Sequence, residues 1–211
     1  MKNYEVNNSV YGTHHLIANE ISEDLKVLDV GCNAGYMKSL VGNCANFSGL
    51  DLSETALKVA KENGYKYVEK IDLDCCEYLK LKESFDVIIF ADILEHLKHP
   101  QECLKFFIEK HLADNGMVII SLPNVAHLSV RVQLLLGRFN YTDSGILDKT
   151  HLHLYTLKTA KKLITQCGLW IEKEKFSSNR FGRAISFFPS LGGLLGFNLL
   201  FFTRPCQKKS S

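Results

Sequence analysis

The sequence lacks the excess of charge that would attract a polyanion. Its 25 Lys and Arg residues nearly balance its 23 Asp and Glu residues, which leaves a formal net charge of +2. The two signs are scattered along the chain, so no basic face generates the long-range field that concentrates nucleic acids on a protein. We therefore expect no nucleic acid partner.

Cysteine pairs with the spacing of a metal site are also missing. The seven cysteines are odd in number, include no C-x-x-C pair and lie mostly within apolar runs. Such a pattern favours reduced thiols in a cytosol over a disulfide framework or a zinc knuckle. The opening residues, MKNYEVNNSVYG, lack the continuous apolar stretch of a secretory signal. We expect a cytoplasmic protein.

The sequence shows no internal repeat, low-complexity tract or Pro/Ser-rich linker that would divide it into two domains. Its 211 residues are a usual size for one α/β domain, and 46% of them are hydrophobic, which supplies a buried core. We therefore expect residues 1–211 to form one domain that folds unaided.

Short apolar runs alternate with segments of helical period, which is a β-α-β-α pattern. The fourth and fifth apolar runs show no alternation of polar and apolar residues, as in strands that are covered on both faces. The pattern predicts an α/β fold: a doubly wound, mainly parallel seven-stranded sheet with helices on both faces. The predicted strands are residues 25–30, 46–50, 67–71, 85–90, 117–122, 169–175 and 198–203.

Predicted helices fill the gaps between these strands. Apolar residues at helical spacing indicate a helix that starts near Pro100 and stops at Asn115-Gly116. Ser53 is placed to cap a helix that Gly64 ends. Further helices are predicted at 10–21, 125–137 and 156–167, and a polar loop at 138–150.

The most informative stretch is LKVLDVGCNAGY, residues 25–36, in which a buried strand ends in an acidic residue and runs through a glycine turn into a helix. In open α/β sheets, ligands bind outside the carboxyl ends of the strands, where the next helix offers free N–H groups. A dinucleotide site would need glycine at the positions held by Gly31, Asn33 and Tyr36, and two of the three do not fit. We therefore expect a different ligand.

Read as D-x-G-x-G-x-G, the same stretch supplies Asp29, Gly31, Asn33 and Gly35. Only Asn33 departs from this pattern, and asparagine tolerates a positive φ better than most residues. On these residues the sequence resembles the class I S-adenosylmethionine-dependent methyltransferases, and the resemblance extends from about residue 10 to residue 176.

Three later landmarks extend the resemblance. Asp51 ends the second strand, where the family's acidic residue accepts hydrogen bonds from both ribose hydroxyls. Asp72 and Leu73 follow the third strand, where the family reads the adenine, and residues 85–97, FDVIIFADILEHL, are similar to the family's fourth strand and following helix. The resemblance implies S-adenosyl-L-methionine as the cofactor, bound by Asp29, Gly31, Asn33, Gly35, Asp51, Leu52, Asp72, Leu73 and Ala91.

The resemblance also implies an architecture, with strands in the order 3-2-1-4-5-7-6 and the helix at 10–21 covering the cofactor. It assigns residues 1–122 to a cofactor-binding half, 123–156 to a lid segment on the acceptor side, and 157–203 to a closing helix and strands. A connection as long as the second of these, at the carboxyl edge of a sheet, is typical of a substrate lid.

The acceptor side is predicted to handle the proton of the methyl acceptor. His151 lies on the lid segment and His96 lies opposite it in the family fold, so both are candidates to orient or deprotonate a hydroxyl group. Residues 134–152, LLLGRFNYTDSGILDKTHL, resemble methyltransferases found with bacterial surface-glycan pathways. We expect O-methylation of a small-molecule or glycan-linked acceptor, without a metal ion.

Three alternatives stay open. Asp92, Glu95, His96 and His151 resemble the divalent metal site of small-RNA 3′-end methyltransferases and some ubiquinone-pathway O-methyltransferases, because residues at i, i+3 and i+4 share one helix face. A metal-dependent RNA 2′-O-methyltransferase is the first functional rival. A cofactor-binding partner protein without catalysis is the second.

Residues 184–202, AISFFPSLGGLLGFNLLFF, carry no charge and are long enough to span a bilayer. However, Pro189 and the glycines at 192, 193 and 196 would interrupt a single helix, and the fold still needs a seventh strand at 198–203. We therefore predict a short apolar helix or loop followed by a buried strand. Membrane contact through 184–202 is the less favoured alternative, by a patch of Phe187, Phe188, Leu191, Leu194 and Leu195.

Overall fold

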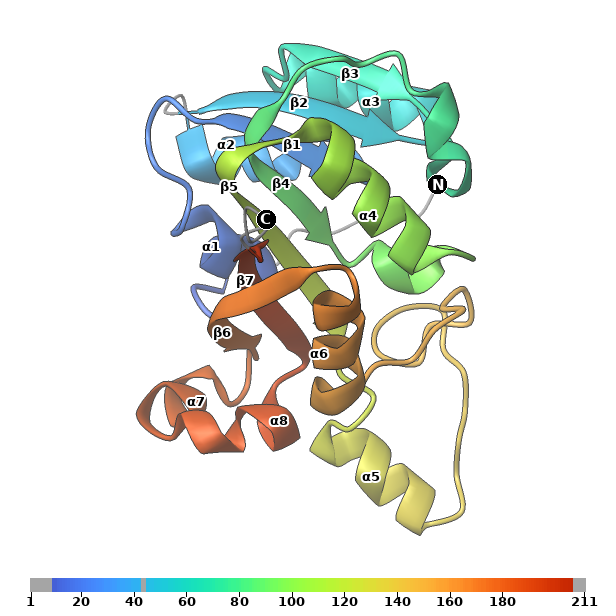
Figure 1. The fold of residues 1–211 in the computed structure, drawn as a ribbon. Coiled ribbons are helices and arrows are strands. Elements are labelled where there is room, and N and C mark those ends of the chain that lie inside the picture. The colour runs from blue at the N-terminus through green and yellow to red at the C-terminus, as the bar shows by residue number, and fades with distance from the viewer. Residues whose placement is uncertain (1–8, 43–44, 207–211) are drawn as a thin grey trace, which may run out of the picture.

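A computed structural model describes residues 9–42 and 45–206 of the chain (Figure 1). At its centre lies a seven-stranded sheet with the order β3-β2-β1-β4-β5-β7-β6. β7 runs antiparallel to both of its neighbours, and all other neighbouring pairs are parallel. The predicted fold class and strand order are therefore confirmed. The strands are β1 (Lys26–Val30), β2 (Asn46–Asp51), β3 (Tyr67–Lys70), β4 (Phe85–Ala91), β5 (Leu112–Pro123), β6 (Leu169–Ser177) and β7 (Asn198–Pro205).

Helices connect the strands, and polar side chains cap several of them, Ser53 among them as predicted. Ser53 accepts the N–H of Ala56 at the start of one helix, and Thr156 forms a reciprocal capping box with Thr159 at the start of another. The helices are α1 (Thr13–Ala18), α2 (Tyr36–Val41), α3 (Glu54–Glu62), α4 (Pro100–His111), α5 (Leu128–Leu135), α6 (Leu157–Gln166), α7 (Gly182–Phe187) and α8 (Gly192–Leu195), with short 3-10 helices η2 (Leu73–Tyr78), η3 (Leu94–His96) and η4 (Pro189–Leu191).

The core lies in two layers, one on each face of the sheet. Helices α1, α2 and α3 lie on one face of the sheet and α4 and α6 on the other (Figure 1). Side chains from the first three form one layer, and side chains from α4, α6 and η2 form the other. Val27 and Leu28, neighbours in β1, are both fully buried and belong to opposite layers. Because successive side chains of a strand point to opposite faces, a strand covered on both sides must be apolar throughout.

Three helices are shorter than the sequence pattern indicated. α4 ends at His111 rather than at Asn115-Gly116, because the chain becomes extended at Leu112, which pairs with Phe85 of β4. The helix prediction for residues 112–115 was wrong, since the apolar side chain that continues the helical stripe fits a strand equally well. The predicted helices 10–21 and 125–137 are likewise shorter, as α1 and α5.

The cysteines show no sign of a framework within the part of the chain that the structure describes. All six of them there are free thiols, and most are buried. Cys44 lies outside the described residues, as do residues 1–8, on which the absence of a secretory signal was argued.

The uncharged segment 184–202 folds as predicted into short helices followed by a strand. α7, η4 and α8 are each only a few residues long, and β7 is buried along residues 198–203. Among the helices of the described residues, none combines the length and the apolar character needed to cross a bilayer. Phe187 and Phe188 are nevertheless 80% and 63% exposed.

The turn between β1 and α2 depends on Gly35. Its φ is 76°, and a Cβ atom there would lie 2.9 Å from Cα of Ala60 and 2.7 Å from the Tyr65 ring. Gly168, which follows α6, has the same φ, but a Cβ atom there would meet no described residue within 4 Å. The two glycines therefore share a positive φ and differ in packing.

We predict that Gly168→Ala costs about 1 kcal/mol of unfolding free energy, through backbone strain alone. Gly35→Ala should cost about 2 to 4 kcal/mol, because overpacking against α3 adds to strain of the same kind. Urea unfolding followed by circular dichroism measures both. Equal losses for the two variants would show that the contact with Ala60 is not tight.

Candidate active site

A cavity of about 250 Å³ opens at the carboxyl ends of β1, β2 and β4. The turn after β1 forms one wall, and the residues that follow β4 form the opposite wall. This is the edge at which open α/β sheets bind ligands. Among the described residues, no Lys or Arg lines the cavity, whereas three aspartates do. The lining residues are His14, Asp29, Gly31, Cys32, Asn33, Tyr36, Met37, Asp51, Ala91, Asp92, Ile93 and His96.

The glycine turn after β1 is fixed by backbone hydrogen bonds to β2. The N–H groups of Gly31 and Cys32 both donate to the carbonyl of Leu50, at 2.8 and 2.9 Å. Gly31 and Asn33 have φ values of 79° and 47°, so asparagine does adopt the conformation expected of it. A Cβ atom on Gly31 would lie 2.7 Å from the Ile93 side chain. The turn therefore needs glycine at this position.

Asp51 lies at the end of β2 and faces the cavity. Its two carboxylate oxygens accept the N–H groups of Asn33 and Ser53, each at 2.8 Å. Each oxygen of a carboxylate has a further acceptor position, so Asp51 can still accept hydroxyl groups of a ligand. The bond to Asn33 also ties the glycine turn to the second strand.

Asp29 is only 5% exposed and accepts a hydrogen bond of 2.6 Å from the Tyr65 hydroxyl. Burial raises the pKa of Asp29 from 3.8 to about 6, the Tyr65 hydrogen bond opposes this rise, and the charge of Asp51 adds to it. At neutral pH the carboxyl group is therefore largely ionised, and keeping this charge buried lowers the stability of the folded protein. A cation in the cavity would reduce that loss of stability.

The other predicted cofactor residues occupy different places. Ala91 lines the cavity, whereas Leu52, which follows Asp51, is 63% exposed. Asp72 accepts the N–H of Asp74 and caps η2, and Leu73 is buried in the core. Asp72 and Leu73 follow β3, next to β2, as the prediction requires, but their side chains do not line this cavity within the described residues.

Two aromatic or basic side chains of the cavity were not predicted. His14 on α1 and Tyr36 at the start of α2 both line it. Burial lowers the pKa of His14, so its ring is neutral at physiological pH. An N-terminal helix was predicted next to the site, and His14 does lie on such a helix, α1. The periodicity of the sequence did not indicate which residue of that helix would face the cavity.

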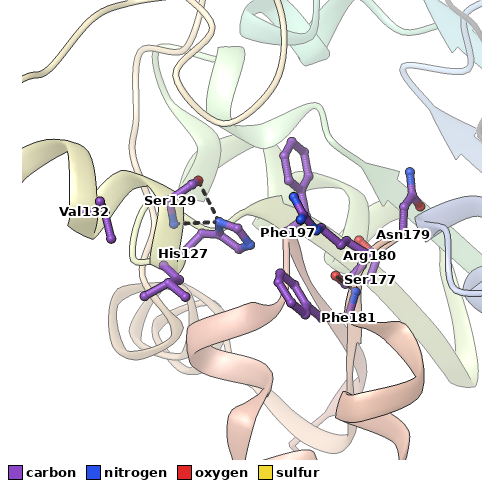
Figure 2. Close-up of a pocket in the computed structure, with 10 residues that line it drawn as sticks. His127, Ser129, Val132, Ser177, Asn179, Arg180, Phe181 and Phe197 are labelled. Atoms are coloured by element: carbon purple, nitrogen blue, oxygen red, sulfur yellow. Dashed lines mark hydrogen bonds between the residues drawn. The ribbon is translucent and has the colours of Figure 1, made fainter.

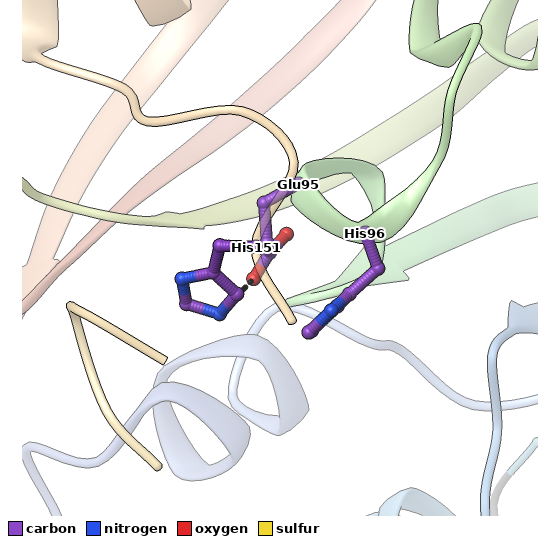
Figure 3. A group of neighbouring side chains, drawn as sticks. All are labelled: Glu95, His96 and His151. Carbon is purple, nitrogen blue, oxygen red and sulfur yellow. Dashed lines mark ion pairs between the residues drawn. The ribbon is translucent and has the colours of Figure 1, made fainter. Parts of the chain in front are cut away.

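His96 also belongs to a cluster of three side chains whose potential metal-ligand atoms lie within 4.8 Å of one another: Glu95, His96 and His151 (Figure 3). Glu95 is 1% exposed, and neither carboxylate oxygen has a hydrogen-bond partner within the described residues. Nε2 of His151 lies 3.9 Å from Oε1 of Glu95, and burial raises the pKa of Glu95 well above its usual value. A buried, unpartnered carboxyl group is costly to keep.

Both histidines of the cluster are held in the same tautomer. Nδ1 of His96 lies 3.2 Å from the carbonyl of Thr150, and Nδ1 of His151 lies 3.1 Å from the carbonyl of Ile146. Because a carbonyl oxygen can only accept, each Nδ1 carries the proton and each Nε2 has a free lone pair. Burial, followed by the neighbouring His96, lowers the pKa of His151, which keeps its ring neutral.

The lid segment is attached to this cluster through its backbone. The N–H groups of Leu152 and His153 donate to the carbonyl of Glu95, at 2.8 and 3.1 Å. Earlier residues of the lid segment form a small hydrophobic core of their own, in which Ile146 and Leu147 pack against Val130 of α5. The predicted approach of His151 to His96 is therefore present, at 4.8 Å between ring centroids.

Asp92 does not join the cluster, so the predicted helix face shared by Asp92, Glu95 and His96 was wrong. η3 covers only residues 94–96, and Asp92 itself has a φ of 52°, outside any helix. Its Oδ1 accepts hydrogen bonds of 2.5 Å from the Ser121 hydroxyl and the Asn198 amide. Asp92 faces the cavity with the cofactor turn instead.

The sequence model of the methyltransferase domain family matches residues 9–174, most of the chain. The chain belongs to this family. The cofactor is S-adenosylmethionine, as the glycine turn and the acidic residues of the cavity predicted. This cofactor carries a positively charged sulfur, which suits a cavity lined by aspartates and by no described Lys or Arg.

Named relatives of this methyltransferase include two ubiquinone biosynthesis O-methyltransferases. The one from Rickettsia canadensis is 29% identical over 166 residues, which cover 74% of this chain and 67% of that protein. The one from Idiomarina loihiensis is 34% identical over 104 residues, which cover 47% of this chain and 42% of that protein. The matched region thus spans about two thirds or less of these relatives.

Solved structures share the fold over nearly the whole chain. An S-adenosylmethionine-dependent methyltransferase from Mesorhizobium loti has a TM-score of 0.63 at 17% identity, covering 93% of this chain and 100% of that one. Another, from Archaeoglobus fulgidus, has a TM-score of 0.61 at 19% identity, covering 91% and 94%. The likeness to both shows the class I fold.

We predict that Asp29→Asn makes the protein more stable above pH 7 but not at pH 4. The folded-state pKa of Asp29, about 6, lies above the ordinary 3.8, so folding favours its protonation and the unfolding free energy falls as pH rises between these values. The variant removes a penalty of about 2 to 3 kcal/mol and keeps an acceptor for Tyr65. Urea unfolding at pH 4 and pH 8 tests this; an unchanged difference between the two pH values would refute it.

Proposed function

We propose that this methyltransferase transfers a methyl group to a hydroxyl oxygen of a small molecule at the edge of the cavity bordered by His96. One observation carries the proposal. His96 lines the cavity opposite the Asp29–Asp51 wall and belongs at the same time to the cluster with Glu95 and His151. A group that can handle a hydroxyl proton therefore faces the place where the cofactor's methyl group would lie.

The cofactor would be held by the turn after β1 and by Asp51. The glycine turn, with Gly31, Asn33 and Gly35, lets the backbone approach the ligand closely, and Asp51 would accept the ribose hydroxyls. Asp29 would complement the positive charges of the amino acid part. The remaining residues proposed to contact the cofactor are Leu52, Asp72, Leu73 and Ala91, with the adenine near Asp72 and Leu73.

When bound, S-adenosylmethionine supplies a methyl group on a sulfonium, whose C–S bond breaks as the acceptor oxygen attacks in line. The chain's own part is alignment and proton removal. Nε2 of His96 has a free lone pair and borders the cavity, so it can take the hydroxyl proton. His151, 6% exposed, lies behind His96 and would support it rather than meet the acceptor first.

The geometry also favours a divalent cation at Glu95, His96 and His151. One ring nitrogen of each histidine and an oxygen of the unpartnered Glu95 carboxylate lie within 4.8 Å of one another, and each histidine donates its Nδ1–H to a carbonyl, as metal-ligating histidines do. Two imidazoles and one carboxylate are a ligand set common to several transition metals. Bound there, such an ion would polarise the acceptor hydroxyl and lower its pKa.

The acceptor is proposed to be a small molecule on the strength of the relatives' names. Both named relatives are O-methyltransferases of ubiquinone biosynthesis. No finding supports a glycan-linked acceptor, and neither RNA methylation nor a partner role without catalysis is favoured. An assay that detects S-adenosylhomocysteine, run over a panel of phenols, catechols and aliphatic alcohols, tests the proposal. Methylation of nitrogen nucleophiles alone would contradict it.

We predict that Asp51→Ala weakens binding of S-adenosylhomocysteine by about 1.5 to 3 kcal/mol, because charge-assisted hydrogen bonds to the ribose are lost. Asp51→Asn should fall between this variant and the wild type, since one acceptor oxygen remains. Glu62→Ala, which removes an exposed carboxylate from α3, serves as the control and should bind normally. Isothermal titration calorimetry decides; unchanged affinity of Asp51→Ala would place the ribose elsewhere.

For the cluster, we predict that Mn²⁺ binds the purified protein and that Glu95→Gln weakens this binding by at least about tenfold. His96→Ala and His151→Ala should do the same while leaving S-adenosylhomocysteine affinity nearly unchanged. His99→Ala, an exposed histidine three residues from His96, is the matched control. The signal of free Mn²⁺ in electron paramagnetic resonance measures binding without an acceptor.

Turnover separates the two roles of the cluster. If a cation is used, a chelator should abolish methyl transfer and all three cluster variants should lower it by about a hundredfold or more. If Mn²⁺ does not bind and a chelator has no effect, His96 acts as a base without a metal. Full activity of both His96→Ala and His151→Ala would remove the cluster from the mechanism.

A further inference from the structure

A second and larger cavity, of about 560 Å³, lies between α5 of the lid and the segment that joins β6 to α7 (Figure 2). α5 contributes Leu128, Ser129 and Val132, with His127 before it, and Phe197 enters from the start of β7. The complete lining is His127, Leu128, Ser129, Val132, Ser177, Ser178, Asn179, Arg180, Phe181 and Phe197. This volume is typical of small-molecule sites, and the cavity is independent of the cofactor turn.

The wall of this cavity leaves much apolar surface in water. Leu128, Val132 and Phe197 are 38%, 46% and 43% exposed. Burial lowers the pKa of His127, so that side chain adds no charge to the wall at neutral pH. Apolar surface gathered in a concave site, rather than scattered, is a feature of ligand pockets.

One positive charge borders the cavity and has no acidic counterpart there. Arg180 is exposed, and its guanidinium lies 5.9 Å from the centre of the Phe181 ring. No salt bridge to Arg180 is present within the described residues, and no lining residue is acidic. An arginine beside an aromatic ring is suited to a carboxylate, sulfonate or phosphate attached to an apolar group.

The cavity lies at the same edge of the sheet as the cofactor cavity. Ser177 is the last residue of β6 and lines the larger cavity, and its hydroxyl oxygen accepts the N–H of Asn198 at 3.2 Å. The Asn198 side chain in turn donates to Asp92, which lines the cofactor cavity. Asn198 therefore stands between the two cavities and contacts both walls.

We propose that this cavity binds the body of the methyl acceptor, and that the acceptor is an amphipathic anion. Its aromatic or aliphatic part would cover Leu128, Val132 and Phe197, its anionic group would meet Arg180, and its hydroxyl would extend past Asn198 toward His96. This proposal rests on the proposed function, because it names the class of acceptor for that reaction. It also gives the lid helix a role in acceptor selection.

The experiment uses the full chain and the fluorescent amphipathic anion 8-anilinonaphthalene-1-sulfonate. Val132→Trp fills the cavity and should weaken dye binding about tenfold or more, and Arg180→Ala should weaken it severalfold by removing the charge. Leu135→Trp places the same bulk on the same helix at an 86% exposed position outside the cavity, and should bind within about twofold of the wild type. Arg183→Ala is the control for charge.

A second readout ties the cavity to catalysis. Methyl transfer to 2,3-dihydroxynaphthalene-6-sulfonate should exceed transfer to catechol in kcat/KM, and Val132→Trp should abolish that preference while its affinity for S-adenosylhomocysteine stays unchanged. Equal dye binding by all variants would overturn the proposal, and so would a preference for the sulfonate that Val132→Trp leaves intact. If the wild type failed to bind S-adenosylhomocysteine, the proposed function would fail, and the dye titration would still decide whether the cavity holds an anion.

Discussion

The burial of carboxyl groups close to one another is the constraint on which the active edge of this molecule depends. Asp29, Asp51 and Asp92 border one cavity, and Glu95 is buried just beyond it. Burial raises the pKa of Asp29 and of Glu95, and a neighbouring charge adds to each rise, that of Asp51 for Asp29 and that of Asp92 for Glu95. The folded protein keeps these buried groups at a cost in stability, and the positive sulfonium of the cofactor would reduce that cost.

Hydrogen-bond donors from the fold satisfy three of the carboxyl groups at this edge. Tyr65 donates to Asp29, two backbone N–H groups donate to Asp51, and Asn198 donates to Asp92. Glu95 alone has no such donor within the described residues. Three of the four carboxyl groups are thus satisfied by the fold itself. This division separates the groups that shape the cofactor cavity from Glu95, which lies beside His96 and His151.

The sequence was sufficient to predict the sheet and the turn after β1, and less so the segments that follow β4 and β5. A buried strand that ends in Asp29 and turns through Gly31 and Gly35 has few other folds open to it, because positive φ and close packing restrict the residues allowed. Strand order followed from the family resemblance. The end of α4 could not be predicted, since an apolar Leu112 fits helix and strand alike.

Contacts between distant segments explain the remaining errors. Asp92 was expected on a helix with Glu95, but its partner Asn198 lies 106 residues away, and no local pattern reports such a pair. The cavity beside α5 is formed by residues from three separate stretches, 127–132, 177–181 and 197. Each stretch taken alone looks like a helix start, a strand end or a loop. The three stretches line one cavity only in the folded chain, in which β7 lies between β5 and β6.

The place of β7 in the sheet has a consequence for how the enzyme is made. β6 pairs with β7 alone among the described strands, and β7 is the last of them in sequence yet inserts between β5 and β6. During synthesis, β6 has no strand partner among the described strands until residues 198–205 have been made. Asn198, which donates to Asp92, is among them. Ser177 and Asp92, one from the wall of each cavity, are therefore linked only after the last described strand has joined the sheet.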